Sequence, residues 1–187
     1  MCPKNAGKPA VAGGPKACRV PWEKAKRYGE EELSQLKEAL GQGTLFYSQG
    51  KKVSALESAM ADKYGMNYAI AASSGTTAIH SAIIAAGISP GEEVLVPPVT
   101  DMGTLVPILW QGAVPVFVDL EPDTYEMSPE AAEAAITPKT KAVIAVHLWG
   151  NPCDMEALEA LCKKHDLVLI EDCAQAWGAV YKGRPVG

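Results

Sequence analysis

The sequence predicts an α/β protein whose doubly wound, mainly parallel sheet is covered by helices on both faces. Two observations support this fold class. From about residue 68 onward, apolar segments of strand length alternate with segments of helical spacing, which is typical of parallel sheets with crossover helices. The strand segments VLVP, VPVFV, AVIAV and LVLI are apolar throughout rather than at alternate positions. Strands of this kind are buried on both faces, so we expect a three-layer arrangement.

The N-terminal part of the chain predicts an arm followed by two helices. Residues 1–28 are rich in Gly, Pro and Lys, so we expect an extended arm there, with a flexible tail as the alternative. Residues 29–187 are expected to form the main domain. Helices are expected at residues 30–40 and 52–64, each followed by glycine. Their apolar faces are expected to hold Leu33, Leu36 and Leu40 in the first helix and Val53, Leu56, Ala59, Met60 and Tyr64 in the second.

From residue 68 the expected elements alternate regularly. The expected strands are residues 68–72, 92–97, 113–119, 141–148 and 167–172. The expected helices are residues 76–86, 102–111, 128–136 and 154–165. Gly87 closes the first of these helices. Ser128 is a favoured N-cap with Pro129 in the first turn, and Asp154 starts the last helix.

The composition is that of an ordinary globular protein. The 187 residues are 48% hydrophobic and 21% charged, and the formal net charge is -5. The basic residues are scattered rather than gathered along one face, which argues against nucleic acid as the main partner. A small-molecule ligand remains possible, because a pocket needs only local charge.

The cysteines and the N-terminus favour the cytoplasm. The five cysteines form no C-x-x-C pair and have no histidine at metal-ligand spacing, so we expect free thiols and no metal site. The N-terminus lacks the continuous apolar core of a signal peptide, and no apolar run approaches membrane-spanning length. We therefore expect a cytoplasmic protein with no membrane partner.

Ligands of such sheets bind beyond the carboxyl ends of the strands. This rule selects residues 73–77, 97–101, 119, 147–151 and 171–175. Among them, His147 is expected to order the loop that follows it rather than to act as a base. Trp149 and Trp177 flank the expected crevice, and we expect them to pack rather than to contact ligand.

The stretch ASSGTT, residues 72–77, joins a strand to a helix. A strand that turns through glycine into a helix presents free N–H groups and the positive end of the helix dipole to one point, where a phosphate would bind. Gly75 would let the ligand approach the backbone, and the hydroxyls of Ser74 and Thr76 would add hydrogen bonds. The alternative is that Ser74 or Thr76 only caps the helix, and this motif alone favours that alternative.

The stretch IEDCAQAWG places Glu171 and Asp172 at the end of the last expected strand. Because side chains alternate along a strand, we expect one carboxylate to face the crevice and the other to face away. A buried carboxylate needs a positive partner, and none follows it in the sequence. Capping of the following turn and metal ligation are the alternatives.

These motifs together resemble one enzyme family. The segments GEEEL, LESAM, SSGTTAIHSAI, GEEVLVP, AVPVFVD, AITPKTKAVIAVHLWGNPCDM and LVLIEDCAQAWGAVYKGRPVG look like the N-terminal half of the DegT-type (DegT/DnrJ/StrS) sugar aminotransferases. The resemblance extends from about Tyr28 to the last residue. It implies the large domain of the fold type I, aspartate aminotransferase-like enzymes that depend on pyridoxal 5′-phosphate.

The resemblance also implies roles for individual residues. Gly75 and Thr76, with Ser74 beside them, match the turn that anchors the cofactor phosphate. Asp172 matches the acid that pairs with the pyridine nitrogen and keeps it protonated, so that the ring withdraws electrons. Gln175 matches a position at the phenolic oxygen of the cofactor. Tyr47 matches a loop near the substrate.

Two departures from the family pattern stand out. Asp101 occupies the position of an aromatic residue that stacks on the cofactor ring, and we assign it either to the cofactor site or to the N-cap of the following helix. The lysine that binds the cofactor covalently in the family is expected downstream of Gly187. The resemblance therefore implies that the chain is the cofactor-domain half of an enzyme, and we expect this half to lack proton transfer without that lysine.

The function implied is transfer of an amino group from an amino acid, expected to be glutamate, to a keto sugar or related cyclic ketone. The family implies a homodimer with a shared site. A dehydratase of the same family, which has histidine in place of the lysine, is one alternative. A non-catalytic binding or regulatory protein that keeps the cofactor pocket, or an inert fragment, is another.

Overall fold

The computed structural model describes residues 8–16, 18 and 26–187, and the chain divides into two units, Met1–Lys51 and Lys52–Gly187. The first unit contains a short 3-10 helix, Ala10–Ala12, and helix α1, Glu30–Gly41. The predicted helix at residues 30–40 is thus confirmed, although Leu33, Leu36 and Leu40 are all exposed. Much of the predicted arm lies outside the described residues, and its boundary at residue 28 stays a prediction.

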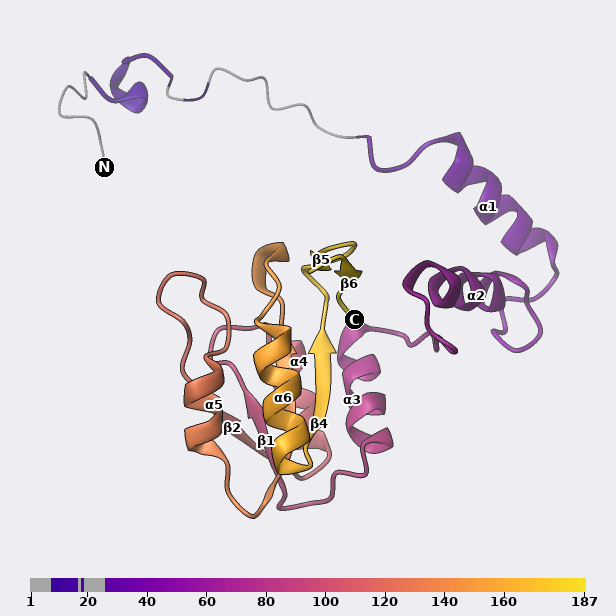
Figure 1. Cartoon of the computed structure of the whole chain (residues 1–187). Helices are drawn as coiled ribbons and strands as arrows, with labels where there is room; N and C mark the ends of the chain where they lie inside the picture. Colours follow the sequence, from indigo (N-terminus) through magenta and orange to yellow (C-terminus); the bar gives the residue numbers. More distant parts are fainter. Residues whose placement is uncertain (1–7, 17, 19–25) are drawn as a thin grey trace. The chain divides into compact units, whose positions relative to one another are not determined.

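The second unit contains the sheet and the remaining helices (Figure 1). Its helices are α2 (Lys52–Tyr64), α3 (Gly75–Ala85), α4 (Met102–Trp110), α5 (Pro129–Ala135) and α6 (Met155–His165), with a short 3-10 helix at Leu148–Gly150. Its strands are β1 (Glu93–Val96), β2 (Val114–Phe117), β3 (Thr140–Val146), β4 (Val168–Asp172), β5 (Val180–Tyr181) and β6 (Arg184–Pro185). Strands β5 and β6 form a separate antiparallel hairpin.

The main sheet has the strand order β2-β1-β3-β4, and every neighbouring pair is parallel. Each parallel connection passes through a helix, as parallel strands require. From β1 the chain first adds β2 on one side and then crosses over to add β3 and β4 on the other side. This reversal of direction is the doubly wound topology that the sequence predicts. All four carboxyl ends therefore meet at one edge.

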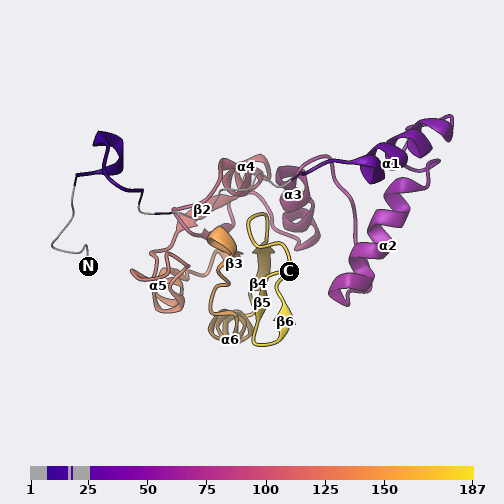
Figure 2. The same ribbon diagram turned by 90° about the horizontal axis from the view of Figure 1, so that it is seen from above.

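Helices cover both faces of this sheet and make three layers. One core joins Val94 and Val96 of β1 to Ile83 of α3 and Ile108 of α4. The other joins Leu95 of β1 to side chains of α5 and α6, including Leu158. Figure 2 shows α3 and α4 on one side of the strands and α5 and α6 on the other. Successive β1 side chains thus enter opposite cores, and this explains why the strand sequences are apolar throughout.

The predicted strand at residues 68–72 is wrong, because the structure contains no strand there. Tyr68 and Ile70 are 86% and 84% exposed. The backbone N–H of Ala71 donates to Glu57 Oε1 of α2 at 2.9 Å instead of to a neighbouring strand. An apolar segment becomes a strand only where a partner strand accepts its backbone hydrogen bonds, and no strand of the described residues pairs with this one.

Helix α2 is confirmed, but its predicted inward face is only partly correct. Val53, Met60 and Tyr64 are half-buried, whereas Leu56 and Ala59 are exposed.

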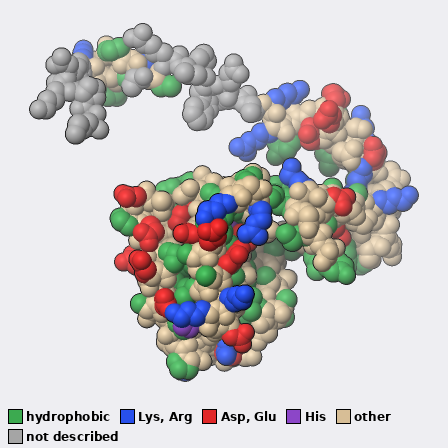
Figure 3. Space-filling view, in the orientation of Figure 1, with side chains coloured by type: hydrophobic (Ala, Val, Ile, Leu, Met, Phe, Trp, Pro, Cys, Tyr) green, Lys and Arg blue, Asp and Glu red, His purple; other side chains and the backbone are tan. Residues whose placement is uncertain are grey.

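No helix in the described part of the chain is both long enough and apolar enough to cross a membrane. On the face drawn in Figure 3, acidic and basic side chains are interspersed over the second unit.

Candidate functional site

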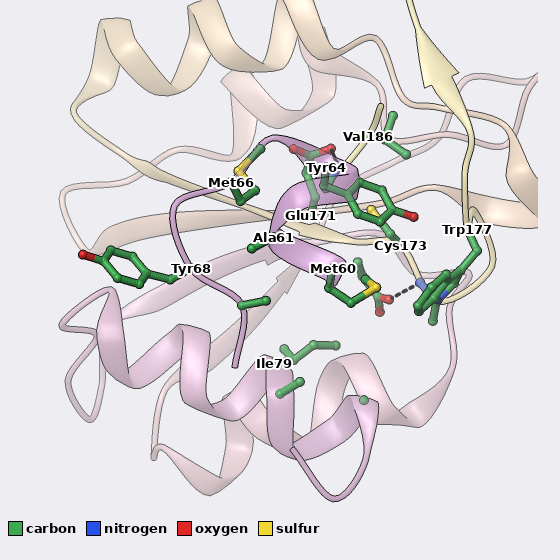
Figure 4. Close-up of a pocket in the computed structure, with 16 residues that line it drawn as sticks. Met60, Ala61, Tyr64, Met66, Tyr68, Ile79, Glu171, Cys173, Trp177 and Val186 are labelled. Atoms are coloured by element: carbon green, nitrogen blue, oxygen red, sulfur yellow. Dashed lines mark hydrogen bonds between the residues drawn. The ribbon is translucent and has the colours of Figure 1, made fainter. Parts of the chain in front are cut away.

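A pocket with a volume of about 350 Å³ lies in the second unit, where the carboxyl end of β4 approaches the N-terminus of α3. Met60 and Tyr64 of α2, Ile79 of α3 and Trp177 contribute much of its apolar lining (Figure 4). Its chemistry-bearing lining residues are Gly75, Glu171, Asp172 and Cys173. The pocket therefore contains a helix N-terminus and carboxylates on a wall that is otherwise mostly apolar.

Ser74 caps the N-terminus of α3, which is the alternative that the motif alone favours. Ser74 is the N-cap, its Oγ accepts from the backbone N–H of Thr77 at 3.2 Å, and its own N–H donates to Thr77 Oγ1 at 3.0 Å. Gly75 follows as the first helical residue, and a Cβ added to it would have no atom within 4 Å. The helix is thus capped by Ser74, while the backbone at Gly75 stays open to an approaching ligand.

Asp172 is a buried carboxylate with two donors from different elements. Its Oδ2 accepts from the hydroxyl of Thr104 on α4 at 2.7 Å, and its Oδ1 accepts from the backbone N–H of Ala174 at 3.1 Å. Asp172 is 9% exposed and lines the same pocket as Gly75. Because neutral donors leave its charge uncompensated, the carboxylate is suited to a cationic group in the pocket.

Asp172 and Glu171 point to opposite faces of β4, as expected, because Asp172 bonds Thr104 of α4 and Glu171 bonds His147, but both residues line the pocket. Strand β4 is an edge strand of the described sheet, and no further strand separates its two sides there. Glu171 Oε2 accepts from His147 Nε2 at 2.9 Å and from the backbone N–H of Gly187 at 3.0 Å. Burial raises the pKa of Glu171, but these hydrogen bonds outweigh burial and leave the pKa below its usual value.

His147 is fully buried and makes hydrogen bonds at both ring nitrogens. Its Nδ1 accepts from the backbone N–H of Cys153 at 3.0 Å, which assigns the ring proton to Nε2 and therefore to the bond with Glu171. The imidazole thus ties β4 to the loop after β3. This agrees with the expectation that His147 orders that loop.

Asp101 is the N-cap of α4, the second of the two roles that the sequence allowed for it. Its Oδ1 accepts from the backbone N–H of Gly103 at 2.7 Å. The side chain of Thr76 reaches the same turn, because a Cβ added to Gly103 would lie 2.9 Å from Thr76 Oγ1 and 3.0 Å from Asp101 Oδ1. The first turns of α3 and α4 therefore meet beside the pocket.

Gln175 is held by the loop after β3. Its Oε1 accepts from the backbone N–H of Trp149 at 2.9 Å, which leaves the amide N–H groups as donors to other groups. Trp149 packs edge-to-face against Tyr125, with ring centroids 5.8 Å apart, as expected, although it is 71% exposed. Trp177 likewise packs edge-to-face against Tyr64 of α2, with ring centroids 6.4 Å apart, while it is 69% exposed and lines the pocket.

The remaining predicted residue, Tyr47, belongs to the first unit and is exposed. Sequence reasoning missed Thr104. The available signal was its spacing of four residues from Thr100 at the start of a predicted helix, which allows the two hydroxyls to meet. It also missed Glu126 and Cys153, whose side chains are buried beside His147.

The ligand atoms of Glu126, His147 and Cys153 lie within 4.8 Å of one another, which is close enough for a metal site. They are already engaged in hydrogen bonds, because the Cys153 thiol donates to Glu126 Oε2 and His147 Nδ1 accepts from the Cys153 backbone. Burial and the adjacent Glu126 raise the pKa of the Cys153 thiol, which keeps it protonated. Burial and the neighbouring carboxylates likewise raise the pKa of Cys173 to about 12. Neither thiol is a nucleophile at neutral pH.

Comparison with known sequences places this arrangement in context. The sequence model described as "DegT/DnrJ/EryC1/StrS aminotransferase family" matches residues 26–187. GDP-perosamine synthase of Escherichia coli O157:H7 is 44% identical over 144 residues, which cover 77% of this chain and 40% of that protein. GDP-perosamine synthase of Caulobacter vibrioides is 43% identical over 144 residues, which cover 77% of this chain and 39% of that protein. The aligned part thus spans about two fifths of the length of these relatives.

Solved structures share the fold. The structure of 3-amino-5-hydroxybenzoic acid synthase superimposes with a TM-score of 0.85 at 36% identity, covering 88% of this chain and 43% of that one. An aminotransferase from Psychrobacter cryohalolentis gives a TM-score of 0.85 at 39% identity, covering 89% of this chain and 42% of that one. The pyridoxal phosphate form of a Streptococcus pneumoniae protein described as a sugar aminotransferase gives a TM-score of 0.77 at 30% identity, covering 86% of this chain and 44% of that one.

Proposed function

Because the chain belongs to the DegT/DnrJ/EryC1/StrS aminotransferase family, we propose that it forms the cofactor-binding part of a pyridoxal-phosphate-dependent aminotransferase. The proposed reaction transfers an amino group from an amino acid, glutamate in our proposal, to a keto sugar or related cyclic ketone. The two curated relatives, both GDP-perosamine synthases, support a sugar as the acceptor. The fold is the large domain of the fold type I enzymes, as its resemblance to three solved relatives indicates.

One observation carries this proposal: Gly75 and Asp172 line the same pocket, with a volume of about 350 Å³. A helix N-terminus suits a phosphate, and a buried carboxylate suits a protonated ring nitrogen. The open backbone at Gly75 gives the phosphate room, since no atom lies within 4 Å of a Cβ added there. The residues present therefore fit a ligand that is anionic at one end and cationic at the other.

Each residue then has a defined task. Ser74, Gly75 and Thr76 would bind the phosphate, through backbone N–H groups and the Thr76 hydroxyl. Asp172 would hold the proton on the ring nitrogen. Gln175 would donate its amide N–H to the phenolic oxygen. When bound, pyridoxal phosphate would withdraw electrons from the substrate carbon whose proton is removed.

Two further residues are part of the proposal. Asp101 caps α4 through Oδ1, so we propose that it does not stack on the cofactor ring. Instead, it would lie next to the cofactor site, where the first turn of α4 meets Thr76 of α3. We assign Tyr47 to the substrate side. The covalent lysine is expected in the part of the protein that corresponds to the remainder of the relatives.

The setting of the protein is part of the same proposal. We assign it to the cytoplasm, which agrees with free thiols at Cys153, Cys162 and Cys173. We assign a homodimer with a shared site, on the strength of the family.

The test uses the full-length protein with pyridoxal phosphate, glutamate and a nucleotide-linked keto sugar. Glutamate should change the visible absorbance of the bound cofactor, and an amino sugar should form. Asp172→Asn should lower kcat by roughly 100-fold or more, because the amide cannot hold the ring proton. Asp166→Asn is the matched control, since Asp166 lies at the far end of α6 in a left-handed conformation that asparagine tolerates. Unchanged turnover in Asp172→Asn contradicts the assignment.

A further inference from the structure

The first turn of α4 contacts both Asp172, which lines the pocket, and Thr76, the neighbour of the lining residue Gly75. Gly103 lies against the hydroxyl of Thr76, with 2.9 Å between that oxygen and a Cβ added to the glycine. The next residue, Thr104, donates to Asp172 Oδ2 at 2.7 Å. One helical turn thus contacts both the proposed phosphate cradle and the proposed partner of the ring nitrogen.

The hydroxyl protons in this turn have a fixed direction. Thr104 has one hydroxyl proton and gives it to Asp172, which as a carboxylate only accepts. The contact of 2.8 Å between Thr100 Oγ1 and Thr104 Oγ1 must therefore be a donation from Thr100 to Thr104. The result is a directed chain from Thr100 through Thr104 to Asp172, in which each hydroxyl is held by the next.

Two donors fix the plane of the Asp172 carboxylate. The backbone N–H of Ala174 holds Oδ1, and the Thr104 hydroxyl holds Oδ2. Thr104 is 1% exposed, so bulk water does not compete for its hydroxyl in the folded protein. Removal of that hydroxyl would leave Asp172 with a single anchor and free to rotate.

We propose that Thr104 is a positioning residue that orients Asp172 toward the ring nitrogen of the cofactor. This inference rests on the proposed function. Thr104 does not itself need to contact cofactor or substrate. Its effect should appear in the interaction that Asp172 makes, and not in the interaction that the α3 N-terminus makes with phosphate.

The test compares two ligands that differ only at the ring nitrogen. Pyridoxal phosphate and its 1-deaza analogue, in which carbon replaces that nitrogen, are titrated into the full-length apoprotein, and the ratio of their dissociation constants is measured. The variants are Thr104→Val, which removes the hydroxyl at nearly constant volume, and Thr104→Ser, which keeps it. Thr100→Val, which removes only the outer donor, is a second probe if Thr104→Val does not fold.

The wild-type protein should bind pyridoxal phosphate more tightly than the analogue, because only the former makes a charge-assisted bond with Asp172. Thr104→Val should lower that preference by roughly ten-fold, the scale of one hydrogen bond to a charged group. Thr104→Ser should keep the preference, and Thr100→Val should lower it by about two- to three-fold, because Thr104 then loses its own anchor.

Other outcomes separate the two proposals. A wild-type preference that survives in Thr104→Val, or in Thr100→Val where Thr104→Val does not fold, overturns the positioning role. An equal loss of affinity for both ligands also overturns it, because that result indicates a structural defect alone. If the wild-type protein shows no preference, the pairing of Asp172 with the ring nitrogen is wrong and the positioning role falls with it. Binding of neither ligand refutes the proposed function itself.

Discussion

The Nε2–H group of His147 donates to Glu171 Oε2 at 2.9 Å, which links the loop after β3 to the end of β4. His147 is fully buried, and its other nitrogen accepts from the backbone of Cys153. The imidazole therefore accepts from the buried Cys153 N–H and adds a second donor to Glu171 Oε2, which also accepts from the backbone N–H of Gly187. A network in which both ends are satisfied stabilises the fold, and the same network is costly when one member is removed.

His147→Phe should lower the free energy of unfolding by about 2 to 4 kcal/mol, because a phenyl ring leaves the Cys153 N–H and the Glu171 carboxylate without this partner. Urea denaturation, followed by circular dichroism, measures the change. His165→Phe is the control, since His165 contacts the exposed Glu133 at 3.4 Å. Its effect should stay within about 0.5 kcal/mol. A similar effect for both variants contradicts the role given to the buried pair.

Glu171 should make stability depend on pH in the acid range. Its pKa is lowered in the folded state, where burial is outweighed by hydrogen bonds from His147 and Gly187. A lowered pKa contributes stability above the unfolded value of about 4.3, and that stability is lost as pH falls through the folded pKa. Glu171→Gln should therefore flatten the stability profile below about pH 4.5. Unfolding midpoints at a series of pH values test this, and a profile as steep as that of the wild type would refute it.

Glu126 should give a pH dependence of opposite sign. Burial raises its pKa, and the hydrogen bond from the Cys153 thiol only partly offsets that. When folding raises the pKa of a carboxyl group, the group stabilises the fold at pH values below its unfolded pKa. That stability is lost as the pH rises through the folded pKa. Glu126→Gln should therefore lose less stability than the wild type as pH rises above about 4.5. If the stability of Glu126→Gln falls as steeply as that of the wild type above about pH 4.5, the effect assigned to the burial of Glu126 is wrong.

The sequence predicted what depends on local pattern. The four parallel strands, the six helices and the Ser74, Ser128 and Asp154 caps are all present. Their signals are apolar runs, helical spacing and capping residues, which act within a few positions. The parallel, doubly wound arrangement followed from the connection rules rather than from any one residue, whereas the strand order β2-β1-β3-β4 comes from the structure.

The errors concern contacts between distant residues. Residues 68–72 are apolar enough for a strand, but strand pairing depends on a partner that the segment itself does not encode. Thr104 is 68 positions away from Asp172 in the sequence, and nothing near either residue indicates that they meet. The burial of Glu126 also depends on a distant residue, Cys153, and the local sequence does not indicate it, because a carboxylate in a loop is ordinarily exposed.

The last prediction concerns the close approach of α3 and α4 at Gly103. A Cβ there would lie 2.9 Å from Thr76 Oγ1 and 3.0 Å from Asp101 Oδ1, so both side chains would have to move. Asp101 Oδ1 accepts from the backbone N–H of Gly103 itself. Gly103→Ala should therefore weaken the cap of α4, and we expect a net loss of about 1 kcal/mol although alanine favours helix.

Gly75→Ala is the matched control, because the same substitution in the first turn of α3 places its Cβ at least 4 Å from any neighbouring atom. It should leave the free energy of unfolding unchanged or raise it by up to about 1 kcal/mol. Urea denaturation of the two variants side by side gives the comparison. If Gly103→Ala is as stable as Gly75→Ala, the two first turns are not in tight contact, and α4 does not set the spacing between Thr76 and Asp172.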